Sequence, residues 1–142
     1  MPPSRSAAAT VAAALALGGC GGGGGDKTPD SEQVITATTD YAHAFGSGDG
    51  AKACSLLTPG GRAALVTRVS SLVGTRDCAE AVQKLQTLAG PNVTAPFESA
   101  TAAGASVNGD RATATLTANG HATEVTLEKH GDAWLLSRAP GL

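Results

Sequence analysis

The chain has 142 residues, and 10 Lys and Arg side chains nearly balance 12 Asp and Glu side chains, which leaves a formal net charge of −2. A nearly neutral chain without a basic run argues against nucleic acid as a partner, because nucleic-acid binding depends on clustered Lys and Arg. Only 3% of the residues are aromatic. A core of Ala, Val and Leu buries little area per residue, so we expect burial alone to give modest stability.

The first residues have the layout of a secretory signal. Arg5 precedes an apolar run over 7–17, and Gly18 and Gly19 supply small residues at the cleavage point. This layout predicts a signal peptide over residues 1–19. The apolar run is shorter than the roughly 20 residues of a membrane-spanning helix, so we expect export without a transmembrane anchor.

The stretch Leu17-Gly18-Gly19-Cys20 resembles the lipobox of bacterial lipoproteins, in which the cysteine is lipidated and becomes the first mature residue. The resemblance implies a diacylglycerol on Cys20 and a location on the extracytoplasmic face of the cell membrane. A diacylglycerol supplies two acyl chains, and stable anchoring needs more than one. The glycine-rich residues 20–29 fit a flexible tether. The alternative is an ordinary secretory signal, which leaves a soluble exported protein.

Two cysteines remain if Cys20 carries lipid. Cys54 and Cys78 are then the remaining cysteines. An even number of cysteines in an oxidising compartment favours a disulfide between them. Such a bond would close a loop of about 25 residues and stabilise the fold by roughly 3 to 4 kcal/mol. The alternative is two free, buried thiols. Neither cysteine has a Cys-x-x-Cys partner or a nearby His, so we expect neither redox catalysis nor a zinc site.

Residues 30–90 have the pattern of helices. Apolar residues at helical spacing between Val34 and Phe45 predict a first helix. Asp30 or Ser31 is expected to cap it, and a series of glycines that starts at Gly46 is expected to end it.

Three further helices are predicted from residues that favour helix N-termini. They begin at Asp49, at Thr58-Pro59 and at Asp77, the last with Glu80 in a variant capping box. The fourth helix is expected to stop at Gly90-Pro91. The expected apolar positions are Leu57 in the second helix, Leu65, Val69 and Leu72 or Val73 in the third, and Val82, Leu85 and Leu88 in the fourth.

The rest of the chain has the pattern of strands joined by tight turns. Asn108-Gly109 and Asn119-Gly120 are two-residue hairpin signals. Helices followed by an antiparallel meander predict an α+β domain over residues 30–142, with helices covering one face of the sheet. The strands are expected within 97–107 and over 111–117, 123–128 and 133–138, with Ala112, Ala114, Leu116, Val125, Leu127, Trp134 and Leu136 facing inward.

Several short motifs occur in an order that carries a resemblance. They are Gly48-Asp49 before the second helix, paired cysteines across the helices, Val-Asn-Gly-Asp-Arg-Ala-Thr at 107–113 and Gly-Asp-Ala-Trp at 131–134. This order resembles that of small exported lipoproteins of actinobacteria with an NTF2-like (cystatin-like) domain. The resemblance implies a curved sheet that wraps a long helix, forming a cone with a pocket at its mouth. Tyr41, Phe45, Val125, Leu127 and Trp134 would line such a pocket; alternatively, these side chains are core.

Asp40, Tyr41 and His43 are the residues that acid–base chemistry inside such a cone would use. The alternative is a solvated pair of Asp40 and His43, which share a helix face, beside a core Tyr41. No two histidines have metal-ligand spacing and no Gly-x-Ser-x-Gly motif occurs. We therefore assign no catalytic residue, no metal and no cofactor.

The sequence favours a non-enzymatic, lipid-anchored binding module at the cell envelope. Its partner would be another protein, a small apolar ligand, or a second copy that docks through the Thr-rich sheet face carrying Glu124 and Glu128. One alternative is a carrier of lipid or another apolar molecule, which needs a cavity of roughly 300 Å³ or more. The other is an isomerase or hydro-lyase that uses Asp40, Tyr41 or His43.

Overall fold

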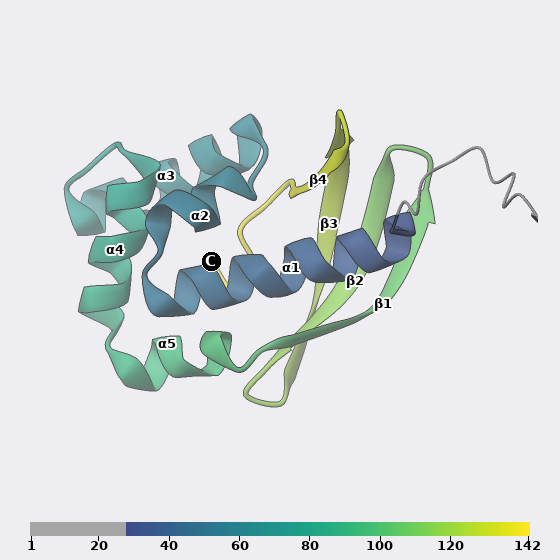
Figure 1. The fold of residues 1–142 in the computed structure, drawn as a ribbon. Coiled ribbons are helices and arrows are strands. Elements are labelled where there is room, and N and C mark those ends of the chain that lie inside the picture. The colour runs from purple at the N-terminus through teal and green to yellow at the C-terminus, as the bar shows by residue number, and fades with distance from the viewer. Residues whose placement is uncertain (1–27) are drawn as a thin grey trace, which may run out of the picture.

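The structure is a computed structural model that describes residues 28–142. The predicted signal peptide, Cys20 and residues 20–27 of the tether lie outside the described residues. Five helices precede four strands (Figure 1). Their bounds are α1 Asp30–Ser47, α2 Gly50–Ser55, α3 Pro59–Val73, α4 Cys78–Ala89, α5 Pro91–Glu98, β1 Thr101–Asn108, β2 Arg111–Ala118, β3 His121–His130 and β4 Ala133–Leu136.

The strands form one open antiparallel sheet in the order β1-β2-β3-β4. The long helix α1 lies across one face of this sheet and contacts β1, β2 and β4. The helices α2, α3 and α4 gather beyond the C-terminal end of α1, on the side of the molecule away from the sheet (Figure 1). This arrangement confirms the predicted α+β class, with helices against one face of an antiparallel meander.

Three predicted helix starts are confirmed. Asp49, Thr58 and Asp77 each accept a hydrogen bond from the backbone N–H three residues on, at 3.1, 3.0 and 2.8 Å. Such bonds satisfy amide groups that have no partner inside the helix. The expected capping box is completed indirectly: the Thr75 hydroxyl donates to Glu80 and also accepts from the Asp77 N–H.

The first helix begins differently from the prediction. Neither Asp30 nor Ser31 caps α1, because Pro29 occupies the cap position and no side chain bonds the first turn. The Asp30 carboxylate instead bonds partners in the sheet, which are described below. The helix ends at Gly48, whose φ of 76° is a left-handed conformation that glycine adopts without strain.

A fifth helix was missed. Gly90 has a φ of 73° and Pro91 occupies the first position of α5. The Gly90-Pro91 pair therefore ends α4 as predicted and also starts the next helix, as proline at a first helical position allows. Phe97 was expected at the start of the first strand, but it lies in α5, and β1 begins only at Thr101.

The central strands have the predicted alternation. The inward residues of β2 and β3 are buried, and the pairings of Ala112 with Leu127 and of Ala114 with Val125 place them on one face. The last strand is shorter than expected and ends at Leu136. Leu57 was predicted within the second helix, but it follows α2 and forms a parallel bridge to Leu136. This bridge ties the helical end of the molecule to the sheet edge.

Gly50→Ala should destabilise the fold by about 1–3 kcal/mol, the usual cost of overpacking. A methyl group at Gly50 would overlap the backbone carbonyl of Ala79, because α2 and α4 approach closely there. Gly60→Ala is the matched control, since a methyl group at Gly60 would meet only the Thr58 hydroxyl, at 3.9 Å. Thermal unfolding measures both variants. Equal melting temperatures for the two would contradict the close approach of α2 and α4.

Candidate functional site

The five residues expected to line a pocket all lie in the hydrophobic core. Their exposed fractions do not exceed 5%. The Phe45 ring contacts two other aromatic rings. The Tyr41 ring stacks on it with 6.0 Å between the ring centroids, and the Phe97 ring meets it edge-on at 5.2 Å. The interior beneath α1 is therefore occupied by side chains. The five residues are Tyr41, Phe45, Val125, Leu127 and Trp134.

Tyr41 is the most unusual of these residues. Its side chain is fully buried, and its hydroxyl has no hydrogen-bond partner among the described residues. Burial raises the pKa of the Tyr41 phenol far above its ordinary value. The phenol therefore stays protonated at physiological pH and cannot act as a base there.

Asp40 and His43 do not converge with Tyr41. The Asp40 carboxylate lies 3.6 Å from the ammonium group of Lys52, and both side chains are partly exposed. His43 is exposed, and its Nε2 atom lies 3.1 Å from the carbonyl oxygen of Ala100. The acid–base hypothesis requires these side chains to point into one cavity, and this geometry does not meet that requirement.

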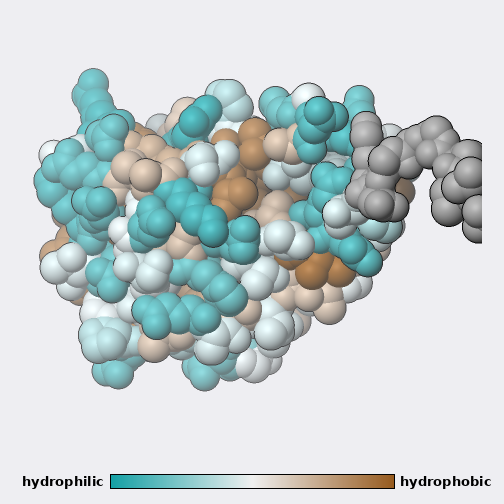
Figure 2. Space-filling view, viewed as in Figure 1, coloured by the Kyte–Doolittle hydropathy of each residue, from teal (hydrophilic) through white to brown (hydrophobic). Residues whose placement is uncertain are grey.

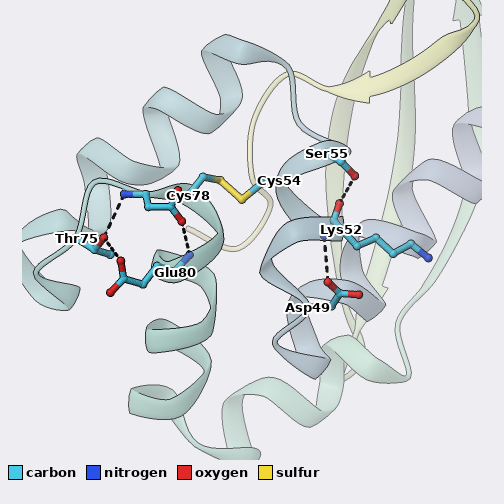
Figure 3. The surroundings of a disulfide bond; sticks show 8 residues. Asp49, Lys52, Cys54, Ser55, Thr75, Cys78 and Glu80 are labelled. Carbon is cyan, nitrogen blue, oxygen red and sulfur yellow. Dashed lines mark hydrogen bonds between the residues drawn. A yellow bond between two sulfur atoms is a disulfide. The ribbon is translucent and has the colours of Figure 1, made fainter.

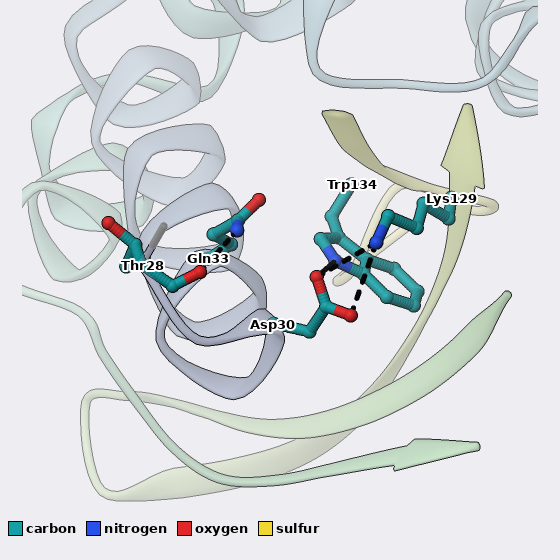
Figure 4. A network of polar contacts seen from close by, with 5 residues as sticks. All are labelled: Thr28, Asp30, Gln33, Lys129 and Trp134. Carbon is teal, nitrogen blue, oxygen red and sulfur yellow. Dashed lines mark hydrogen bonds and ion pairs between the residues drawn. The ribbon is translucent and has the colours of Figure 1, made fainter. Parts of the chain in front are cut away.

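A polar network joins the start of α1 to the far strands of the sheet (Figure 4). The Lys129 ammonium group donates to both carboxylate oxygens of Asp30, at 3.0 and 3.1 Å, and the Trp134 indole N–H donates to the same carboxylate at 3.1 Å. The ammonium group also lies 5.6 Å from the centre of the Trp134 ring, within the range of a cation–π contact. The sequence contains only one indication of this network, which is the acidic residue Asp30 beside a predicted helix start.

An open depression of about 610 Å³ borders this network. Gln33 lines it and donates from its amide to the Thr28 carbonyl oxygen at 2.6 Å. The lining residues are Thr28, Pro29, Asp30, Gln33, Lys129 and Asp132. None of them is a Leu, Val, Ile, Met or aromatic residue, and the one cation already has a carboxylate partner, so the depression has the character of hydrated surface.

The predicted disulfide is present (Figure 3). Cys54 in α2 and Cys78 at the start of α4 are bonded, with 6.1 Å between their Cα atoms. Cys54 is buried and Cys78 is partly exposed. Because Cys78 follows the capping residue Asp77, the bond fixes the start of α4 against α2.

An apolar groove runs between α3 and α4. Leu72 is 64% exposed and Leu88 is 61% exposed, although the sequence placed Leu88 on the apolar side of its helix. That expectation is wrong because no described element covers this side of α4 near its end. The groove measures about 610 Å³ and is lined by Leu72, Val73, Glu80, Gln83, Lys84, Thr87 and Leu88.

The groove carries little net charge. The Lys84 ammonium group lies 2.7 Å from the Glu80 carboxylate, one helical turn away. Hydrogen bonds from Lys84 and Thr75 hold the pKa of Glu80 below its ordinary value. Elsewhere, on the face seen in Figure 2, hydrophobic residues form small separate patches within a mostly hydrophilic surface. Two leucines that flank one groove are therefore a notable apolar feature.

Two negative findings concern residues 28–142. No group of three His, Cys, Asp or Glu side chains in this part of the chain is placed to hold a metal ion. None of the helices α1 to α5 combines the length and the apolar character required to cross a bilayer.

Tyr41→Phe should leave the free energy of unfolding unchanged or raise it by up to about 1 kcal/mol. The substitution removes a buried hydroxyl that has no partner and keeps the ring, so the folded state loses no hydrogen bond. Denaturant unfolding measures the change. Tyr41→Leu is the comparison, because it also removes the ring contact with Phe45 and should destabilise the fold. A loss of more than about 1 kcal/mol in Tyr41→Phe would mean that the hydroxyl is bonded.

The chain was compared with models of protein families, with curated proteins and with solved structures. No family model, no curated protein and no solved structure matches it.

Proposed function

We propose that this chain is a non-enzymatic binding module whose α3–α4 groove receives an apolar helix of a partner protein. We further propose that lipid on Cys20 holds the module at the extracytoplasmic face of the cell membrane. The position of α1 across one face of the sheet supports the resemblance to NTF2-like domains. We therefore propose the curved cone of that family for residues 30–142.

The observation that carries the proposal is the pair of exposed leucines at the groove. Leu72 belongs to α3 and Leu88 to α4, so each wall of the groove offers one apolar side chain. A groove between two packed helices suits the apolar face of a third helix, which is a common mode of peptide recognition. Because Glu80 and Lys84 neutralise each other, apolar contact rather than charge would select the partner.

The lining of the groove favours a protein over the bilayer as the occupant, because Glu80, Gln83, Lys84 and Thr87 would lose their hydration in lipid. The 18 residues of α1 span roughly 27 Å. The helices α3 and α4, which form the groove, lie beyond the C-terminal end of α1 (Figure 1), whereas the predicted tether precedes Asp30 at its N-terminal end. Seven residues separate Cys20 from Thr28, and the eight steps from one Cα atom to the next extend at most about 29 Å. Because this reach is about equal to the length of α1, a chain anchored at Cys20 can turn its groove away from the membrane and towards a partner protein.

The membrane anchor is tested by Cys20→Ala. Removal of the thiol removes the attachment point for lipid, so we expect the variant to leave the membrane fraction while the wild type stays there. Fractionation and the intact mass of the mature chain measure this change. Ser55→Ala is the control, because its exposed hydroxyl bonds only within its own helix. A mature, unlipidated chain that stays with the membrane would contradict the anchor.

The groove is tested by photocrosslinking in intact cells. A photoreactive phenylalanine analogue replaces Leu88 in one variant and Thr113 in a control, and Thr113 lies on the sheet face opposite the buried Ala112 and Ala114. We expect one discrete adduct from position 88 and none from position 113. Addition of Leu72→Gln should lower the yield of the adduct at least about tenfold, since the groove loses the exposed leucine of α3.

Three outcomes would reject the groove as the partner site. The first is an adduct of the same mass from both positions, and the second is an adduct that survives Leu72→Gln unchanged. The third is an adduct of twice the chain mass from position 113 alone, which would favour pairing of two copies through the Thr-rich sheet face.

A further inference from the structure

We propose that a second depression binds a small, uncharged, largely apolar molecule. This depression lies between α5, the β2–β3 turn and the segment 139–142, and we call it the α5 pocket. It is separate from the α3–α4 groove and shares no lining residue with it. The inference therefore stands whether or not the groove binds a protein.

The α5 pocket is small and has an apolar floor. Its volume is about 300 Å³, at the lower end of the range for small-molecule sites. Leu116 lies at the floor and is almost fully buried, while Val93 stands at the rim with 53% of its surface exposed. Phe97 and Pro96 continue the apolar wall along α5. The space suits a molecule of about two to three rings.

The lining chemistry selects an uncharged ligand. No Lys, Arg, Asp or Glu is among the residues that line the pocket. A charged molecule would lose its hydration there without an opposite charge to compensate, which is costly. The polar lining residues offer hydrogen bonds to one or two polar atoms of a neutral ligand instead. They are Asn92, Asn119, His121 and Thr123.

The walls of the pocket are held in place by side-chain packing and by turn geometry. The Phe97 ring packs edge-on against Phe45 in the core. Gly141 closes the other side of this ring: a Cβ atom there would come within 3.0 Å of Phe97 Cζ, and its φ of 80° favours glycine. Asn119, with a φ of 50°, forms the tight β2–β3 turn that positions His121. A preformed site binds without a large ordering cost.

The test uses two fluorescent probes that differ in charge. N-phenyl-1-naphthylamine is neutral, and 1-anilinonaphthalene-8-sulfonate has the same ring system with an added sulfonate. Both probes are titrated into the full chain. Binding is assigned to the pocket only where its affinity differs between wild type and a pocket variant. We expect the neutral probe to bind at least about tenfold more tightly than the sulfonate, because the lining holds no Lys or Arg.

Three variants locate the binding. Val93→Arg places a charge at the rim and should weaken binding of the neutral probe at least about tenfold. Val107→Arg is the matched control, because Val107 is also exposed, at 37%, and lies on β1 away from the pocket. Leu88→Gln, in the groove, should also leave binding unchanged.

The proposal is overturned by any of four results. The first is equal binding of the neutral probe to wild type and to Val93→Arg, and the second is a loss of binding in Val107→Arg as large as that in Val93→Arg. The third is a loss of affinity in Leu88→Gln, which would place the probe in the α3–α4 groove. The fourth is binding of the sulfonate as tight as that of the neutral probe, which would contradict selection for an uncharged ligand.

Discussion

The bond between Cys54 and Cys78 is the constraint on which the helical end of the molecule depends. α4 buries only Ala81 and Val82 completely, and α3 packs chiefly on α4 rather than on the sheet. Two small buried side chains contribute little hydrophobic stabilisation. A covalent link across this loop offsets the shortfall by roughly 3 to 4 kcal/mol, because it removes conformations from the unfolded chain. The same bond holds α4 in position, and with it one wall of the apolar groove.

Helix starts could be predicted because their chemistry is local. Asp49, Thr58 and Asp77 each bond an amide only three residues away, so the identity of one residue and its neighbours is sufficient. Asp30 has the same carboxylate, but its partner Lys129 lies 99 residues away along the chain. Sequence spacing cannot show which bond such a carboxylate makes, because the choice depends on where the sheet brings its strands.

The candidate sites depend on the same distinction. Helical periodicity placed Leu88 on the face of Val82, but periodicity cannot show whether another element covers the end of that face. The aromatic residues of the core were identified because large apolar side chains are usually buried. The α5 pocket was not predicted, because its walls come from three segments that only the tertiary fold brings together. A Gly-Pro pair that both stops and starts a helix concealed one of those segments.

The contact between Asp30 and the sheet also has a mechanical consequence. A pull on the residues before Thr28 reaches the fold at the first turn of α1, where a helix without a capping side chain would fray most easily. The carboxylate at that turn is bonded to Lys129 on β3 and Trp134 on β4, so the load passes directly into two hydrogen-bonded strands. The first turn of α1 is thereby tied to the sheet, and a pull there has to break these side-chain bonds before the helix can unwind from its end.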